Sequence, residues 1–326
     1  MIIGVPKEIQ NHEGRVGLDP AHIRGLILYG LVEGGKVLVE KGAGRLSGFP
    51  DNWYELQGAE IVSQREVWEK SDMIIKVKEP MEQEYQLLLP GRTVMAFFHF
   101  AGNPILKEIC DYKKIIAIPY EDLKVDGKSP ILGAMSTIAG EISVDVGERY
   151  LGVGIEHGGR GMPLRDAVVA IIGCYGVAGT SARNMFMKRG IRRMFGVDRA
   201  DVDTSECSRK FDYLSSSPKT IAFVLEQSDI VVGAVLMEKG APKLITREML
   251  KKMKPWSVFI DIGIDEGGIS ETSRPTSHDN PIFVEEGVIH YCVRNMPGIV
   301  PERSTPALIN ASFPFITEQI RKMTSA

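Results

Sequence analysis

Short apolar runs alternate with amphipathic stretches along most of the chain. Near-continuous apolar runs are typical of strands in a parallel sheet whose two faces are both covered by helices. The alternation of such strands with helices predicts an α/β fold. In the first part of the chain, strands are expected at 1–5, 36–40, 72–77, 93–100 and 114–120, and helices at 19–31 and 103–113.

The middle of the chain repeats this alternation. Two longer amphipathic stretches, 133–155 and 306–320, are expected to be helices that join the two parts. We therefore predict two Rossmann-like, doubly wound parallel-sheet domains joined by long helices, with residues 1–131 plus 299–326 as the substrate domain and 132–298 as the NAD-binding domain. The strands expected in the second domain are 167–172, 192–198, 229–235, 257–263 and 290–293, and its helices are 180–190 and 246–254.

Length and composition agree with two soluble domains. The chain has 326 residues, with 44% hydrophobic and 25% charged residues, whereas one domain commonly has ~100–200 residues. The net charge of -3 gives no basic surface for nucleic acid. No apolar run is long enough for a membrane, and the N-terminus becomes charged too early for a signal peptide. The scattered Cys110, Cys174, Cys207 and Cys292 predict reduced thiols in a cytoplasmic protein, without a metal site.

A glycine-rich turn, "IIGCYGVAGTSA", follows the apolar run 167–172. A strand, such a turn and a helix form the pyrophosphate site of dinucleotide-binding folds, where free N–H groups of the helix face the phosphates. Gly176 and Gly179 have the spacing of the last two glycines in G-x-G-x-x-G, with Val177 and Ala178 between them. Gly173 comes one residue too early, and Cys174 stands at the position of the first glycine.

An acidic residue ends the next predicted strand. Asp198 lies 19 residues beyond Gly179, close to the ~20 expected for the acid that binds the cofactor's ribose hydroxyls. This position favours NAD over NADP, because a carboxylate repels a 2′-phosphate. Arg199 weakens that preference slightly.

Four polar stretches interrupt the apolar pattern. Ligands of open α/β sheets bind beyond the carboxyl ends of the strands, and several of these groups fall there. Taken one at a time, each also has an ordinary structural explanation, such as a surface charge or a core histidine. The residues are Arg15 after the first strand, Lys76 and Lys78 at the end of the third, His99 inside the apolar strand 93–100, and Asp261 and Asp265 after another strand.

Together these stretches resemble the alanine dehydrogenases and the related NAD-binding subunit of proton-translocating transhydrogenase. The resemblance extends over nearly the whole chain. It rests on blocks that include "GVPKEIQNHEGRVGLDP", "IIKVKEP", "FFHFAG", "GAMSTIAGE", "VVGAVL", "DIGIDEGGISETSRPTSHDNPIF" and "CVRNMPGIVPERSTPALINASFPFI".

The resemblance implies a role for each matching position. Arg15 would bind the substrate carboxylate, and Lys78 would help to hold and polarise the substrate. Met135 would line the substrate pocket, and His99 would be the general acid/base. Asp265 would lie beside the nicotinamide. The cofactor contacts implied are Ser136, the glycine turn, Asp198, Val235, Leu236, Asn295 and Met296.

The resemblance implies NAD-dependent deamination of an L-amino acid, with L-alanine and pyruvate as the default pair. It also implies a homo-oligomer, either a dimer or a hexamer, with small-molecule partners only. The chain departs from the family in its glycine turn, in a shortened segment before residue 167, and at Thr137 and Glu141. Two alternatives stay open: an imine reductase acting on another amino acid or 2-oxo acid, and a non-catalytic, transhydrogenase-like subunit.

Overall fold

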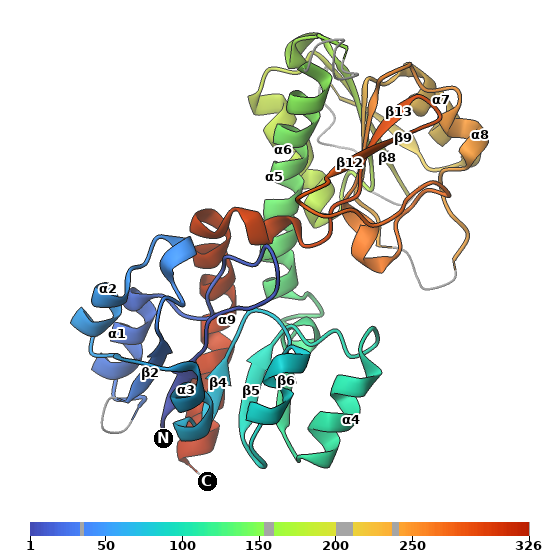
Figure 1. Cartoon of the computed structure of the whole chain (residues 1–326). Coiled ribbons are helices and arrows are strands. Elements are labelled where there is room, and N and C mark those ends of the chain that lie inside the picture. Colours follow the sequence, from blue (N-terminus) through green and yellow to red (C-terminus); the bar gives the residue numbers. More distant parts are fainter. Residues whose placement is uncertain (33–35, 153–159, 200–210, 237–240, 326) are drawn as a thin grey trace. The chain divides into compact units, whose positions relative to one another are not determined.

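The computed structural model describes residues 1–32, 36–152, 160–199, 211–236 and 241–325. The chain forms two compact units, each with its own sheet (Figure 1). The first unit consists of Met1–Met135 and Pro297–Ala326, and the second of Ser136–Met296. The chain therefore leaves the first unit, builds the second as one continuous segment, and returns.

The sheet of the first unit has six parallel strands in the order β3-β2-β1-β4-β5-β6. β1 lies between β2 and β4, with Ile3 opposite both Val37 and Met73. The direction of the strand order reverses between β1 and β4, so the loops after these two strands diverge at the carboxyl edge and leave a crevice for a ligand. The strands are β1 (Ile3–Val5), β2 (Val37–Glu40), β3 (Glu60–Val62), β4 (Met73–Ile75), β5 (Thr93–Ala96) and β6 (Ile116–Pro119).

Helix starts in this unit follow from local sequence. Asp19 and Asn103 cap α1 and α4 with their side chains, and a proline follows each cap, where its fixed φ suits the first helical position. Ser63 and Glu66 form a reciprocal capping box at the start of α3. The helices are α1 (Pro20–Leu28), α2 (Asp51–Leu56), α3 (Gln64–Lys70), α4 (Pro104–Tyr112) and α9 (Pro301–Thr324).

The C-terminal helix α9 completes the first unit. The Thr305 hydroxyl lies 2.8 Å from the Ser47 hydroxyl, and Phe313 packs edge-on against His22 of α1. Leu308, Ile309, Ile316 and Ile320 of α9 are buried. The last segment of the chain therefore supplies part of the first unit's core.

The first five strands of the second unit repeat the order of those in the first. Its seven-stranded sheet has the order β12-β13-β11-β10-β7-β8-β9, in which only β12 is antiparallel. The order reverses between β7 and β10, and ligands of open α/β sheets bind beyond the carboxyl ends of strands at such a reversal. The strands are β7 (Val168–Ile172), β8 (Arg193–Asp198), β9 (Phe211–Ser215), β10 (Ile230–Gly233), β11 (Val258–Asp261), β12 (Ile282–Glu285) and β13 (Val288–Tyr291).

Helices α5 and α6 pack very closely against each other in the second unit. At Gly140 of α5, an added Cβ would stand 2.2 Å from the carbonyl oxygen of Ala178. The Ser181 hydroxyl of α6 donates to the Thr137 carbonyl of α5, at 2.8 Å. The helices are α5 (Pro130–Gly152), whose first turn belongs to the first unit, α6 (Val177–Lys188), α7 (Pro218–Gln227) and α8 (Arg247–Leu250).

The α/β class and the two parallel sheets predicted from the sequence are confirmed, but the strand predicted at 93–100 is too long. β5 ends at Ala96, and the chain turns at His99 with φ +49°. The prediction extended the strand because the apolar run continues through Phe97 and Phe98, which are buried beyond the strand end. His99 is therefore an exposed turn residue and not a strand residue within the core.

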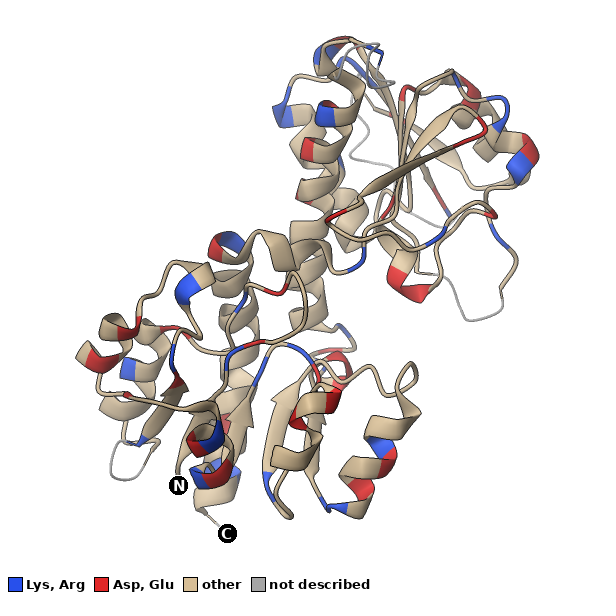
Figure 2. Cartoon of the chain, viewed as in Figure 1, with Lys and Arg blue, Asp and Glu red and all other residues tan. Residues whose placement is uncertain are grey.

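Charges of both signs are spread over the helices and loops of each unit (Figure 2). Among the described residues, no helix has the length and apolar character needed to span a bilayer.

Candidate active site

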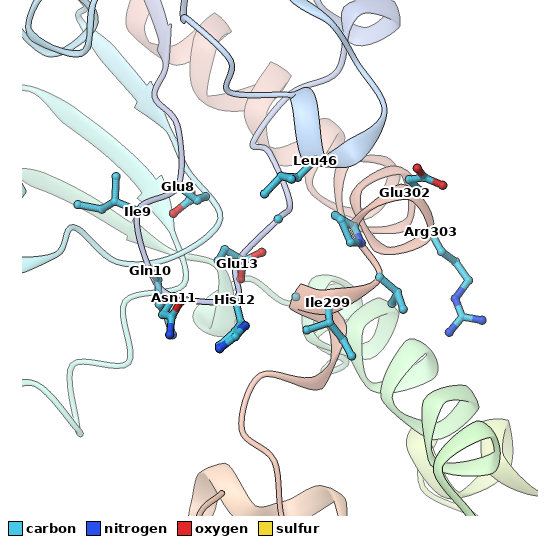
Figure 3. A pocket seen from close by; sticks show the side chains of 14 residues that line it. Glu8, Ile9, Gln10, Asn11, His12, Glu13, Leu46, Ile299, Glu302 and Arg303 are labelled. Atoms are coloured by element: carbon cyan, nitrogen blue, oxygen red, sulfur yellow. The ribbon is translucent and has the colours of Figure 1, made fainter. Parts of the chain in front are cut away.

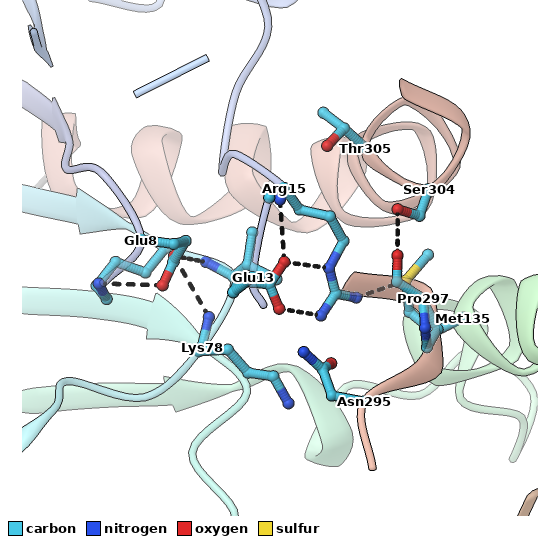
Figure 4. Close-up of polar contacts among 12 residues, drawn as sticks. Glu8, Glu13, Arg15, Lys78, Met135, Asn295, Pro297, Ser304 and Thr305 are labelled. Atoms are coloured by element: carbon cyan, nitrogen blue, oxygen red, sulfur yellow. Dashed lines mark hydrogen bonds and ion pairs between the residues drawn. The ribbon is translucent and has the colours of Figure 1, made fainter. Parts of the chain in front are cut away.

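The loop after β1 places a buried ion pair at the crevice of the first sheet. Arg15 donates from Nε to Glu13 Oε1 at 2.7 Å and from Nη2 to Glu13 Oε2 at 2.5 Å (Figure 4). Both side chains are almost completely buried. Two parallel bonds between a guanidinium and a carboxylate fix the plane of the guanidinium as well as its position. The sequence singled out Arg15 but missed Glu13, two residues before it.

Met135 lies against the same arginine. Its Sδ is 2.9 Å from Arg15 Nη1 (Figure 4). A thioether is a weak acceptor, so a carboxylate would be a far stronger partner for that end of the guanidinium. The structure thus brings together Arg15 and Met135, two residues predicted to contact the substrate.

A second buried charge cluster lies where β1 and β4 end. Lys76 Nζ contacts Glu84 Oε1 at 2.9 Å and Glu8 Oε2 at 3.2 Å, and all three side chains are buried. Burial by itself lowers the pKa of Lys76, but the two carboxylates outweigh it and the pKa is raised. Lys76, a candidate from the sequence, is therefore held inside the protein by two glutamates that the pattern did not single out.

Glu8 connects this cluster to Lys78. Its Oε1 accepts from the N–H of Val77 at 2.6 Å and from that of Lys78 at 3.4 Å. Burial raises the pKa of Glu8 to about 7. The charge of Lys76 opposes this rise, and the charge of Glu13 adds to it. Lys78 itself is half-buried, with its side chain drawn beside the cluster in Figure 4.

A cavity of about 840 Å³ opens next to these groups (Figure 3). It is lined by the loop 8–14, Leu46 and the segment 298–303 at the start of α9. Glu8 and Glu13 belong both to this lining and to the charged clusters. The two buried ion-pair clusters therefore border this cavity.

His99 sits in a neighbouring turn of the first unit. Its main-chain N–H donates to Glu121 Oε1 at 2.6 Å, and the same carboxylate accepts from the N–H of Phe98 at 3.2 Å. The imidazole stacks on Phe97, with ring centroids 5.8 Å apart. Glu121 thus fixes the left-handed turn that exposes His99. No pattern in the sequence pointed to this contact.

In the second unit, the glycine turn follows β7 at the crevice of the sheet. Gly173 has φ +86°, and a Cβ there would stand 2.6 Å from the carbonyl oxygen of Ala234. A Cβ on Gly179 would stand 2.0 Å from the carbonyl oxygen of Gly173. Both positions therefore require glycine, for a left-handed turn and for close packing of helix on strand respectively.

Gly176 differs from the other two glycines. It is the N-cap of α6 in an extended conformation, and the nearest atom to an added Cβ is 3.4 Å away. The helix therefore begins at an exposed residue, and no side chain caps the N–H groups of its first turn, which is formed by Val177, Ala178 and Gly179. An anion-binding helix terminus requires such an accessible start.

The remaining predicted cofactor residues lie on elements around this turn. Ser136 is half-buried on α5, one residue before Thr137, which bonds to α6. Val235 and Leu236 follow β10, and Leu236 is 72% exposed. Asp198 ends β8, and its Oδ2 accepts from the N–H of Tyr175 in the glycine turn at 2.9 Å.

Asp265 lies in the short helix η7 (Ile262–Glu266) after β11 and is exposed. Its Oδ2 is 3.5 Å from the N–H of Asn295, which precedes the buried Met296. Asp261 is instead a buried structural residue, whose Oδ2 accepts from Ser273 Oγ at 2.5 Å. Burial raises the pKa of Asp261. The structure therefore joins Asp265 to the block around Asn295 and separates it from Asp261.

Two family models match this chain, and together they cover almost all of it. The model described as "Alanine dehydrogenase/PNT, N-terminal domain" matches residues 4–139. The model described as "Alanine dehydrogenase/PNT, C-terminal domain" matches residues 147–325. The chain belongs to the alanine dehydrogenase/PNT family. Helix α9 falls within the second match, although it packs in the first compact unit of this family member.

Individual relatives agree with the family models. Alanine dehydrogenase 2 of Staphylococcus aureus (strain N315) is 42% identical, over 97% of this chain and 86% of its own length. Alanine dehydrogenase of Staphylococcus haemolyticus (strain JCSC1435) is 41% identical with the same coverage. A solved L-alanine dehydrogenase is similar, with a TM-score of 0.89 and 36% identity over 97% of this chain and 89% of that one.

A solved transhydrogenase from Sinorhizobium meliloti shares the fold, with a TM-score of 0.84 at 24% identity over 98% of this chain and 94% of that one. As a member of this family, the chain uses a nicotinamide cofactor. The residues of the second unit fit such a group, since Gly173 and Gly179 build the required turn and Gly176 leaves space above it.

Proposed function

We propose that this protein is an NAD-dependent dehydrogenase that oxidatively deaminates a small L-amino acid, with L-alanine as the first substrate to test, and that catalyses the reverse amination of the 2-oxo acid. The observation that carries the proposal is that each unit has candidate groups at the carboxyl edge of its own sheet. The first unit holds Arg15, Lys78 and Met135, and the second holds the glycine turn and Asp198. The similar proteins described above, which are alanine dehydrogenases, support the same reaction.

Arg15 would bind the substrate carboxylate. Glu13 occupies Nε and one hydrogen of Nη2, so a carboxylate would approach the Nη1–Nη2 end and displace the weakly accepting Met135 Sδ. Because Glu13 balances the charge of Arg15, Lys78 would supply the positive charge that attracts the anionic group. Met135, pushed aside but still in contact, would limit the space for the side chain.

The proton transfers would fall to His99. Its turn is fixed by Glu121, while its ring remains exposed, and imidazole exchanges protons near neutral pH. His99 would take a proton from the water that adds to the iminium carbon and return one as ammonia leaves. When bound, the nicotinamide ring supplies the acceptor for the hydride on Cα. Asp265 would face that ring from the second unit.

The direct test is an absorbance assay for NADH with the purified protein and a panel of L-amino acids. We expect NADH to form with L-alanine, and pyruvate with ammonium to consume NADH. His99→Ala should lower kcat by about 10²–10⁴-fold, the range for a lost acid/base group, with NADH affinity unchanged. NADH binding without turnover of any L-amino acid or 2-oxo acid would contradict the proposed reaction. Normal turnover by the variant would contradict only the role of His99.

We also propose that the protein is a homo-oligomer. Large apolar side chains are exposed on α1 and α2 of the first unit, including Leu28 at 69%, Tyr29 just after α1 at 80%, and Leu56 at 76%. Such side chains close together are typical of surfaces that another chain covers. Light scattering coupled to size exclusion should give a mass that is a multiple of 36.0 kDa, and a monomer at micromolar concentration would contradict this.

A further inference from the structure

The glycine turn of this chain contains one more residue than G-x-G-x-x-G, and the structure shows where the extra length goes. Gly173 to Gly176 close a four-residue turn, in which the Gly176 N–H donates to the Gly173 carbonyl at 3.2 Å. Cys174 points inward and is completely buried. Its Sγ would be 2.8 Å from a Cβ on Gly196 of β8. Tyr175 remains half-buried at the surface of the turn.

The main chain of Tyr175 reaches the acid at the end of β8. Its N–H donates to Asp198 Oδ2 at 2.9 Å, and the N–H of Arg199 donates to Asp198 Oδ1 at 2.9 Å. Each carboxylate oxygen is thus tied to a main-chain group. An ionised carboxylate has about four acceptor positions, so the orientation is fixed while lone pairs remain for a ligand.

The ring of Tyr175 anchors the turn in this place. It lies over the guanidinium of Arg183, with 5.1 Å between ring centroid and Cζ, and Phe211 lies 5.3 Å from the same Cζ. Tyr213 of β9 meets the ring edge-on at 5.5 Å. Arg183 is itself 7% exposed. A buried cation that contacts two aromatic rings is a favourable contact, so the ring of Tyr175 holds the turn against α6 and β9.

We infer that Tyr175 is a positioning residue for the cofactor's adenosine half: it locks the Asp198 carboxylate in the orientation that accepts ribose hydroxyls, and it thereby excludes a ribose 2′-phosphate. This inference rests on the proposed use of NAD. An aspartate that was free to rotate could turn away from a 2′-phosphate and leave the exposed Arg199 side chain to bind it. With both oxygens tied to N–H groups, the negative charge stays at the 2′ position.

The test compares NADH and NADPH binding to the full-length protein by the fluorescence of the reduced nicotinamide. Wild-type protein should bind NADH at least tenfold more tightly than NADPH. Deletion of Tyr175, which restores G-x-G-x-x-G, should lower this ratio about tenfold, mainly through tighter NADPH binding, because a hydrogen bond to a charged group is lost. Tyr175→Ala keeps the N–H but loses the anchoring ring, and should lower the ratio about threefold. Tyr175→Phe keeps both, so its ratio should match that of the wild type.

Circular dichroism and thermal unfolding identify variants that fail to fold, and Tyr175→Ala carries the test if the deletion does not fold. A lower ratio in either folded variant supports the inference. Ratios within twofold of wild type in both folded variants, or a wild-type protein that binds NADPH as tightly as NADH, would overturn it. If the wild type bound neither nucleotide, the proposed function itself would fail, which is a distinct result.

Discussion

At the scale of single residues, the first unit shows how a cation can be held in a buried place. Arg15 shares its charge with Glu13, and Lys76 shares its charge with Glu8 and Glu84. A buried pair adds little stability beyond what apolar residues would give, but removing one partner leaves an uncompensated charge. These glutamates therefore serve to fix geometry beside the site more than to stabilise the fold.

Glu13→Gln tests this role at Arg15. The amide keeps the size of the side chain but loses the charge that holds the guanidinium from the side. We expect kcat/KM for the amino acid to fall ten- to hundredfold and the free energy of unfolding to fall by about 3 kcal/mol. Steady-state kinetics and urea unfolding measure the two effects. Glu69→Gln, at an exposed ion pair with Arg65, is the matched control and should change neither. Unaltered kinetics in Glu13→Gln would refute the positioning of Arg15.

Glu8 gives the first unit a defined pH dependence. Its pKa is raised from 4.5 to about 7 in the folded protein, so between these pH values the folded state binds more protons than the unfolded chain. Stability due to this group is present at low pH and is lost as the pH rises from 4.5 to 7, by about 3 kcal/mol. Urea unfolding between pH 4.5 and 8 should show this decline in wild type and a flatter profile in Glu8→Gln. Parallel profiles would contradict the raised pKa.

At the scale of elements, the glycine turn joins a strand and a helix through three glycines that do different work. Gly173→Ala would place a Cβ against the Ala234 carbonyl at a left-handed φ. We expect the free energy of unfolding to fall by about 2 kcal/mol. In Gly176→Val the Cβ would make only ordinary contacts with the protein, the nearest atom being 3.4 Å away, but the side chain would fill the exposed surface at the helix start. This substitution should leave stability nearly unchanged and weaken NADH binding more than tenfold. Thermal unfolding and NADH titration distinguish the two variants. Unchanged NADH affinity in Gly176→Val would contradict a phosphate site at this helix start.

Sequence patterns predicted the central strands of both sheets better than the edges. β1, β4, β7 and β10 are buried on both faces, so each appears in the sequence as a nearly continuous apolar run. β3 has only three residues, and none of them is buried. β9 carries Asp212 between apolar residues, and none of the four residues of β12 is buried. Helix α3 could have been found from its Ser63–Glu66 capping box, and α7 from Ser217 followed by Pro218.

The candidate residues were predictable as chemistry but not as geometry. Arg15, Lys78 and Asp198 could be chosen because they follow apolar strands. The partners of Lys78 and Asp198 could not, since Glu8 contacts Lys78 across 70 residues and Tyr175 contacts Asp198 across 23. The sequence also could not show that the chain turns before His99, because the apolar run there continues past the last ladder hydrogen bond of β5.

At the scale of the whole molecule, each unit has its own sheet and its own core. The second unit is one continuous segment, and its core draws on β7, β8, β10 and β11 together with α7. A fragment of residues 130–296 should therefore fold alone and bind NADH. Circular dichroism, cooperative unfolding and NADH titration would check this. An unfolded fragment, or a folded one without NADH binding, would show that the second unit depends on the first.

The return of the chain to the first unit has a consequence for synthesis on the ribosome. The core of that unit is incomplete until α9 emerges, since Leu308, Ile309, Ile316 and Ile320 lie on a helix that is made only after the second unit. At roughly 5–20 residues per second, the first sheet waits on the order of 10–30 s while the second unit is translated. The second unit can fold as it leaves the ribosome, so the half of the protein made first is the half that is finished last.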